Sequence, residues 1–205
     1  MPKTAPARTR DLKRTRSEML NAAFTEIFMN GFQGVSIDKI IARTGLTKGA
    51  FFHQFPTKMD LGYALVDEVL RDLIRTRWVE PLAEFDNPLE GIISQMNKLI
   101  GKASDSQLQL GCPLNNLVQE MTNVDRTFAR KLSAVMDYWI DGIEAALKRG
   151  ISNGYIRESV KTREAAIYIV MFHEGMYGFL KAQPDHKMFL SLFKVFKQQM
   201  DAYRA

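Results

Sequence analysis

The residues of this sequence best suited to chemistry are one cysteine and three histidines. They are Cys112, His53, His173 and His186. His173 and Glu174 begin like the H-E-x-x-H helix of zinc metalloproteases, in which two histidines one turn apart bind the ion. Tyr177 stands where the second histidine belongs, so we expect no metal site and no bound cofactor.

Cys112 offers a second kind of chemistry. It could pair with His173 as a nucleophile, but no signature of a cysteine enzyme accompanies the two residues, and we expect no catalytic residues. Pro113 opens a helix directly after Cys112, and a helix start lowers the pKa of a neighbouring thiol. Two interpretations stay open: a reactive sensor thiol beside a ligand site, or a buried small apolar side chain.

Composition limits the class of protein. The 205 residues, 46% of them hydrophobic, suffice for one large domain or two small ones. No run of about 18 apolar residues could cross a bilayer, so we expect no membrane partner. Residues 17–30 mix polar with apolar side chains, unlike a signal peptide. We therefore expect a cytoplasmic protein, and a single cysteine fits a reducing compartment.

Charge is concentrated near the N-terminus. Residues 1–60 carry ten Lys/Arg and five Asp/Glu, whereas the remaining residues carry 18 of each, so the excess of +5 lies in the first sixty. A basic head on a neutral body indicates a polyanion-binding module. A solvated basic tail is the other interpretation of the charge.

Residues 36–55, SIDKIIARTGLTKGAFFHQF, have the pattern of two short helices joined by a tight turn. We expect helices at about Ser36–Arg43 and Lys48–Gln54, with a turn at Gly45 and a stop before Pro56. The expected core is Ile40, Ile41, Leu46, Phe51 and Phe55. In a helix-turn-helix the start of the second helix enters the major groove of DNA. This pattern predicts a DNA-binding module.

The sequence at this point resembles the tetracycline-repressor (TetR) family. The resemblance runs without a gap over roughly residues 15–62 and is carried by Gly31-Phe32, Val35-Ser36-Ile37, Ile40-Ile41, Thr44-Gly45-Leu46-Thr47-Lys48-Gly49, Phe51-Phe52-His53-Gln54-Phe55, Lys58 and Leu61. It implies an all-helical homodimer whose three N-terminal helices bind DNA. The larger C-terminal part would bind a small effector, and the last two helices of each subunit would form a four-helix bundle.

The resemblance also implies which residues contact DNA. By position these are Ser36, Thr47, Lys48, Gly49, Ala50, Phe52, His53 and Lys58. Ser36 and Lys58 would meet phosphates, and Lys48 would reach a guanine or a phosphate. Phe52 departs from the family, where tyrosine is usual, and its ring cannot donate a hydrogen bond to phosphate. His53 or Gln54 would then compensate.

Helical spacing recurs along the whole chain, and no segment alternates as a strand does. We expect a first helix over Lys13–Asn30 and a long helix opened by a capping box at Thr57, with Leu61, Leu65, Val69 and Leu73 inward. Further helices are expected at about residues 89–103, 113–122, 126–153, 162–182 and 186–203, with a loop over 104–111. The fold class is therefore all-α, organised as a basic flexible arm (1–12), a helix-turn-helix domain (13–56) and an effector-binding and dimerisation domain (57–205).

The last two expected helices have apolar residues on two sides. In the first of them one stripe is Ala166, Ile169, Val170, His173, Met176, Tyr177 and Leu180, and the other is Tyr168, Phe172, Gly175 and Phe179. A helix at the edge of a monomer needs one stripe, so the second indicates a homodimer through these helices. Burial of both stripes in one intrachain core is the alternative.

The run Gly111-Cys112-Pro113-Leu114-Asn115-Asn116-Leu117 resembles a TetR branch with a Gly-Cys-x-x-x-Asn-Leu pattern in the effector domain. Some members of that branch respond to reactive electrophiles or unsaturated acids. Pro113 replaces the usual leucine. The residues that we expect around an effector pocket are Cys112, Asn116, Trp139, His173 and Tyr177. Core packing of Trp139, Tyr177 and His173 is the alternative.

The sequence thus predicts a transcriptional regulator that binds double-stranded DNA at a pseudo-palindromic operator and is released by a small-molecule effector, including a reactive or unsaturated compound. The helix that opens at Thr57 would transmit the signal. Two alternatives remain: a TetR-like activator or architectural DNA binder without an effector, and, more distantly, a cysteine-dependent enzyme acting on small electrophiles.

Overall fold

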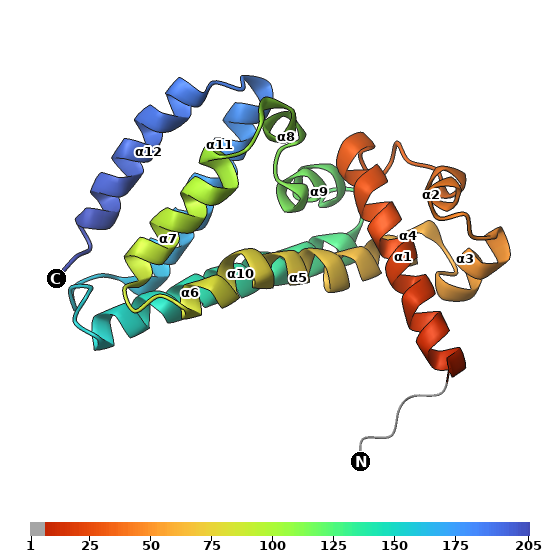
Figure 1. The fold of residues 1–205 in the computed structure, drawn as a ribbon, viewed down its shortest axis with the longest axis horizontal. Helices are drawn as coiled ribbons and strands as arrows, with labels where there is room; N and C mark the ends of the chain where they lie inside the picture. Colours follow the sequence, from red (N-terminus) through yellow and green to blue (C-terminus); the bar gives the residue numbers. More distant parts are fainter. Residues whose placement is uncertain (1–6) are drawn as a thin grey trace, which may run out of the picture. The chain divides into compact units, whose positions relative to one another are not determined.

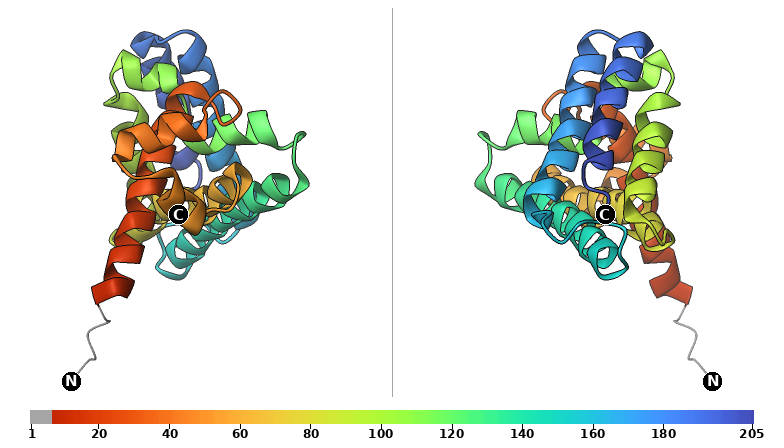
Figure 2. Two further views of the ribbon diagram at one scale, coloured as in Figure 1. Left: turned by 90° about the vertical axis from the view of Figure 1, so that its right-hand side faces the viewer. Right: turned by 90° about the vertical axis from the view of Figure 1, so that its left-hand side faces the viewer.

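A computed structural model describes residues 7–205, with side-chain surroundings from Leu12 onward (Figures 1 and 2). The helices are α1 (Ala7–Asn30), α2 (Ile37–Thr44), α3 (Lys48–Gln54), α4 (Lys58–Ala64), α5 (Arg71–Ile74), α6 (Glu80–Ala83), α7 (Pro88–Met96), α8 (Asp105–Leu110), α9 (Pro113–Met121), α10 (Arg126–Ser152), α11 (Thr162–Ala182) and α12 (His186–Asp201). Three π-helical segments interrupt them: η1 (Leu65–Leu70), η2 (Arg75–Val79) and η3 (Asn97–Gly101). Residues 7–205 contain no β-strand, which confirms the all-α class.

Most predicted helices are found, with two differences. α1 begins at Ala7 rather than Lys13, so the second half of the expected flexible arm is helical, and residues 1–6 lie outside the described residues. The loop expected over residues 104–111 is wrong, because α8 forms there. Ser104 and Gln107 make a capping box, in which the side chain of each accepts a hydrogen bond from the backbone N–H of the other.

The chain folds into two compact units. The first comprises the described residues up to Leu70 together with Asn116–Leu132, and the second comprises Arg71–Asn115 and Ser133–Ala205. This grouping differs from the predicted division after Pro56. The reason is that α4 and η1 pack on α1, while the segment from Asn116 adds Phe128 to the same core.

The core of the first unit is aromatic. Phe51 and Phe55 are buried, as predicted, and Phe32 lies edge-on to Phe128 with ring centroids 4.9 Å apart. These two rings explain Gly62 on α4, since a Cβ there would lie 2.5 Å from Cζ of Phe128 and 2.6 Å from Cε2 of Phe32. Any side chain at this position would displace them.

The second unit is a helical bundle in which α7, α11 and α12 run side by side (Figures 1 and 2). Trp78 of η2 and Trp139 of α10 are both fully buried, with ring centroids 5.4 Å apart. Their contact joins α10 to the helical stretch that follows α4. No helix of the described residues is both long and apolar enough to cross a membrane.

The segment η1 changes which side chains of its helical stretch face inward. A π-turn adds one residue to the usual four, so it shifts the buried positions by one. Leu61 and Leu65 are buried as predicted, and Val66 is buried beside Leu65. Further along, the buried positions are Leu70 and Ile74 rather than Val69 and Leu73. The predicted pair is only half-buried. The α-helical period used for the prediction cannot reveal such an inserted residue.

This register can be tested by truncating neighbouring side chains. Leu70→Ala should lower the free energy of unfolding by about 2–5 kcal/mol, because it removes a fully buried side chain. Val69→Ala, the matched control, should cost less than about 1.5 kcal/mol. Chemical denaturation at one fixed protein concentration measures both. Equal losses would contradict the register described here.

Candidate nucleic-acid interface and buried polar cluster

The two short helices of the helix-turn-helix are fixed by capping. The Ser36 hydroxyl accepts a hydrogen bond from the backbone N–H of Lys39 at 3.2 Å, and that of Thr47 accepts one from Ala50 at 3.1 Å. Gly45, with φ +67°, ends α2 in the left-handed region. The predicted DNA contacts Ser36 and Thr47 therefore already hold the backbone of α2 and α3.

A buried carboxylate holds α2 on α1. Glu26 of α1 accepts from Nζ of Lys39 at 3.0 Å and is also paired with the Arg43 guanidinium. The side-chain amide of Asn30 donates to Oε2 of Glu26 at 3.2 Å, the same oxygen that Lys39 contacts. These contacts, that with Arg43 foremost, lower the pKa of Glu26 below its ordinary value. Two of the cations counted toward the basic head are thus engaged inside the unit.

The start of α3 presents exposed side chains to solvent. Lys48 and Asp38 form an ion pair of 2.7 Å, and both side chains are 67% exposed. Gly49 and His53 are exposed and Ala50 is half-buried. Phe52 is 47% exposed, with its ring edge-on to Phe51. The structure therefore brings the predicted contact residues of α3 together on one short helix, with an acidic side chain beside the lysine.

Lys58, the remaining predicted contact, is only partly exposed at the start of α4. Its ammonium group lies 4.8 Å from the centre of the Phe32 ring and 3.4 Å from the carbonyl oxygen of Gln33. Partial burial lowers the pKa of Lys58 below its ordinary value, and the nearby carboxylate of Glu120 opposes this shift. Its charge is held against the body of the unit.

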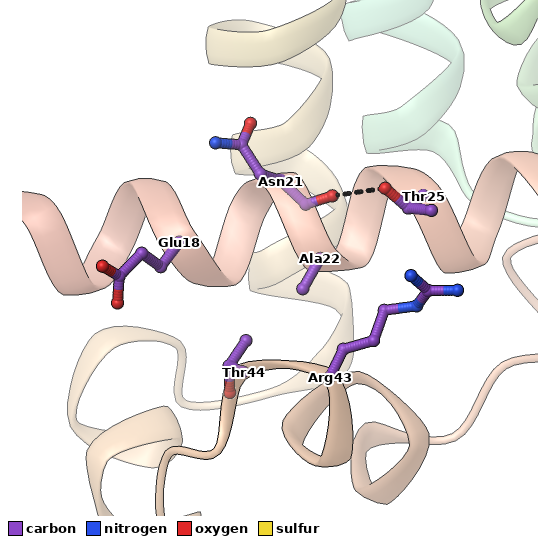
Figure 3. Close-up of a pocket in the computed structure, with 6 residues that line it drawn as sticks. All are labelled: Glu18, Asn21, Ala22, Thr25, Arg43 and Thr44. Carbon is purple, nitrogen blue, oxygen red and sulfur yellow. Dashed lines mark hydrogen bonds between the residues drawn. The ribbon is translucent and has the colours of Figure 1, made fainter.

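A shallow groove of about 400 Å³ lies between α1 and α2 in the same unit (Figure 3). Its lining is Glu18, Asn21, Ala22, Thr25, Arg43 and Thr44. The Thr25 hydroxyl donates to the backbone oxygen of Asn21 at 3.0 Å, and Arg43 is committed to Glu26. None of the predicted site residues lines this groove.

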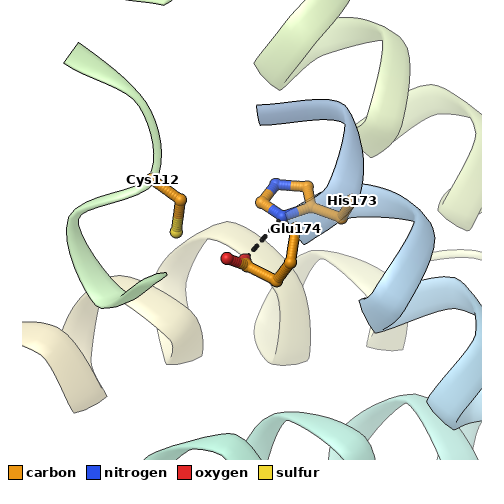
Figure 4. A group of neighbouring side chains, drawn as sticks. All are labelled: Cys112, His173 and Glu174. Carbon is orange, nitrogen blue, oxygen red and sulfur yellow. Dashed lines mark hydrogen bonds and ion pairs between the residues drawn. The ribbon is translucent and has the colours of Figure 1, made fainter. Parts of the chain in front are cut away.

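The second unit contains a buried polar cluster formed by Cys112, His173 and Glu174 (Figure 4). One sulfur, one ring nitrogen and one carboxylate oxygen lie within 4.8 Å of one another. Nδ1 of His173 is 2.9 Å from Oε1 of Glu174. The cysteine comes from the loop before α9, and the other two come from α11.

Aromatic rings surround His173. The ring centroids of Trp139, Tyr177 and Trp78 lie 4.8, 4.8 and 5.3 Å from that of the histidine. The hydroxyl of Tyr177 donates to the carbonyl oxygen of Leu99 at 3.0 Å. Within the described residues, the indole N–H of Trp139 and Oε2 of Glu174 are buried without a hydrogen-bond partner. Such groups are costly to bury unpaired.

Of the two interpretations of Cys112, the structure supports the buried small side chain rather than the thiol of low pKa, since the residue is 5% exposed. Burial raises the pKa of this thiol well above its ordinary value, and the charge of Glu174 adds to the rise. The backbone N–H groups of Leu114 and Asn115 act in the opposite direction, as expected for a helix start, but they are outweighed. Burial also raises the pKa of Tyr177 to about 12.

Four of the five predicted pocket residues thus contact or approach one another. The fifth, Asn116, is half-buried and belongs to the first compact unit. The sequence prediction missed Glu174 and Trp78 as residues of the site. The signal for Glu174 was its place beside His173; nothing in the linear sequence connects Trp78 with His173.

The capped two-helix unit, with an exposed lysine at the start of α3, defines the class of helix-turn-helix regulators. Residues 19–65 match the family model described as bacterial regulatory proteins, tetR family, and residues 88–191 match the tetracyclin repressor-like C-terminal domain. The chain belongs to the TetR family. The members it matches are DNA-binding regulators and not enzymes.

Individual relatives are distant. An HTH-type transcriptional regulator in the lacX 3' region of Lactococcus lactis is 25% identical over 60% of this chain and 62% of its own length. The HTH-type transcriptional repressor DhaR of a Mycobacterium species is 23% identical over 74% of this chain and 75% of its own. The chain thus spans less than two thirds of the Lactococcus relative.

A crystal structure of a TetR-family regulator from Cytophaga hutchinsonii has the same fold. It covers 99% of each chain with a TM-score of 0.86, at 18% sequence identity. This likeness extends the fold assignment over the two compact units and over segments that the family models leave unmatched.

Asp38 should restrain Lys48 from meeting DNA. Asp38→Asn removes one negative charge and the ion pair without changing side-chain size, so we expect two- to five-fold tighter DNA binding, about the value of one exposed pair. The gain should shrink as salt is raised. Fluorescence anisotropy titrations measure it. Asp67→Asn, which breaks an exposed pair with Lys131, is the control, and an unchanged affinity of Asp38→Asn would refute the restraint.

Proposed function

We propose that this chain is a ligand-responsive repressor that binds operator DNA as a homodimer and leaves it when a small effector binds the second unit. The observation that carries the proposal is the capped α2–α3 unit, whose exposed residues at the start of α3 match the base-reading positions of a helix-turn-helix. One relative, DhaR of a Mycobacterium species, is a transcriptional repressor, which supports repression rather than activation.

The contacts that we propose with DNA take account of the groups that are free to make them. The hydroxyls of Ser36 and Thr47 accept capping bonds but retain their own protons for a phosphate. Lys48 would leave its ion pair with Asp38 and contact DNA instead. Phe52 cannot donate to phosphate, but an exposed aromatic ring suits the methyl group of thymine.

Exposed apolar side chains support dimerisation through α11 and α12. They are Ile167, Met171, Phe179, Leu190, Leu192 and Val195. A Cβ built on Gly175 or Gly178 would have nothing within 4 Å, so another helix could approach closely there. A two-fold dimer would place its two recognition helices about 34–36 Å apart or a multiple of that, on a pseudo-palindromic operator.

The effector site would lie around Cys112, Trp139, His173 and Tyr177, with Asn116 as a further residue of the proposal. Two polar atoms without a hydrogen-bond partner among the described residues, the indole nitrogen of Trp139 and Oε2 of Glu174, support a site that accepts a ligand. The buried thiol with its raised pKa disfavours reaction with electrophiles. A buried carboxylate at Glu174 likewise disfavours an anionic effector such as an unsaturated acid. From the resemblance to the branch with Gly111-Cys112 we therefore keep the proposed position of the site and not the proposed class of ligand.

Helix α9 supports a route between effector and DNA. It begins directly after Cys112, and near its other end Glu120 accepts hydrogen bonds from the backbone N–H groups of Phe32 at 2.8 Å and Gln33 at 2.7 Å. These two residues precede α2. An effector that shifts α9, together with the stretch beginning at α4, would need about 1–3 kcal/mol of coupling to change operator affinity 5–150-fold.

Replacing Lys48 and replacing Lys58 should weaken DNA binding in different ways. Lys48→Ala should weaken binding to a selected operator by about 1–3 kcal/mol and change the preference among operator variants. Lys58→Met keeps the aliphatic stem over Phe32 and removes a phosphate contact, so operator and scrambled DNA should weaken equally. Gel-shift titrations on both duplexes compare them. Equal losses on both DNAs for both variants would remove the distinction.

Dimerisation can be tested on the exposed face of α11. Phe179→Glu places a charge at a side chain that is 67% exposed in the single chain, so it should leave the fold intact and produce monomers. Val124→Glu, also exposed but in the turn before α10, is the control and should stay dimeric. Sedimentation equilibrium distinguishes the states, and a dimeric Phe179→Glu would contradict this interface.

A further inference from the structure

We propose that Cys112, His173 and Glu174 form a binding site for a divalent transition metal of the zinc class. Its regulatory role, as the effector of the site assigned above, rests on the proposed function. The sequence predicted no metal site because Tyr177 stands where an H-E-x-x-H helix has its second histidine. The structure instead joins residues about sixty positions apart.

The geometry is close to that of a bound ion. Ligand atoms at about 2.0–2.3 Å from zinc stand roughly 3.3–3.8 Å apart in a tetrahedral site. The sulfur, nitrogen and oxygen of the cluster already lie within 4.8 Å of one another, so the widest separation would have to shorten by about 1 Å. Nδ1 of His173 and Oε1 of Glu174, which are 2.9 Å apart, would have to separate by about 0.5 Å. To bind an ion through Nδ1, the neutral imidazole of His173 would carry its proton on Nε2, so this ligand neither gains nor loses charge.

The chemistry of the three groups selects the metal. Sulfur and imidazole ligands favour zinc-class ions over calcium or magnesium, which prefer oxygen. On binding, the Cys112 S–H bond breaks, a metal–sulfur bond forms, and the proton leaves to the solvent. A thiolate and a carboxylate then balance the +2 charge of the ion. This neutrality matters because all three residues are buried, where uncompensated charge is costly.

An unpartnered atom gives an independent indication of a ligand. Oε2 of Glu174 has no hydrogen-bond partner within the described residues, although its side chain is only 10% exposed. A monatomic ion can satisfy a carboxylate oxygen without a cavity large enough for an organic molecule. With three protein ligands, a fourth position would remain for water or another small ligand, as in open zinc sites.

A bound ion would also tie the loop before α9 to α11, since Cys112 belongs to the first and the other two ligands to the second. This tie fixes the start of the helix that carries Glu120. Metal occupancy would therefore bias the same helix whose far end holds the backbone before α2.

Titration of the chelator-stripped full chain with Co²⁺ under reducing conditions tests the site. We expect one ion per chain, intense visible bands of a four-coordinate site, a near-ultraviolet thiolate-to-cobalt band, and displacement by Zn²⁺. Cys112→Ser should abolish the thiolate band and weaken binding at least about 10-fold. Glu174→Gln, of equal size, should also weaken binding, and thermal unfolding checks that both variants fold.

His186→Ala is the matched control, because this exposed histidine lies 3.4 Å from an oxygen of Asp105 and could bind metal adventitiously. It should leave the spectrum unchanged. Absence of stoichiometric binding, or an identical spectrum in Cys112→Ser, would overturn the proposal. DNA binding of the metal-stripped chain is measured separately. If that chain binds no DNA, the proposed function fails while the titration still decides the metal site.

Discussion

A buried carboxylate must be compensated, and the arrangement of the DNA-binding unit depends on how Glu26 meets that requirement. Its two oxygens collect Lys39, Arg43 and Asn30, which fixes α2 on α1 and thereby sets the position of the turn at Gly45. Glu174 in the second unit differs, because Oε1 has a hydrogen bond with His173 whereas Oε2 has no hydrogen-bond partner among the described residues. The fully paired carboxylate of Glu26 holds two helices together, whereas the partly paired carboxylate of Glu174 keeps an oxygen that a ligand could contact.

The same pairing limits what a charge count can say about DNA binding. Lys39, Arg43 and Lys48 belong to the excess of positive charge in the first sixty residues, yet all three are paired with acidic side chains of the unit. Lys58 is partly withdrawn onto Phe32. The number of basic residues in this segment therefore exceeds the number of cations free to contact a phosphate, and that number depends on which ion pairs open on binding.

Much of the fold could be predicted from the sequence because local signals were strong. α3 and α11 have the predicted bounds, and Thr57 and Asp60 form the predicted capping box at α4. The inserted residue of η1 escaped prediction because its cause is packing rather than local propensity. The residues expected to contact DNA were implied by the resemblance to the TetR family. The polar cluster around Cys112 arises from tertiary contacts between distant segments, so only its histidine and cysteine could be suggested.

In α2 and α3, different residues stabilise the backbone and form the exposed surface. Ser36 and Thr47 hold the backbone, while Gly49, Phe52 and His53 are exposed and cap neither helix. Under the proposed function, substitutions at those three positions would change the surface offered to a base pair with little effect on folding. Related chains could therefore acquire new operators through such changes while keeping the same scaffold, which makes target choice the more evolvable property of this module.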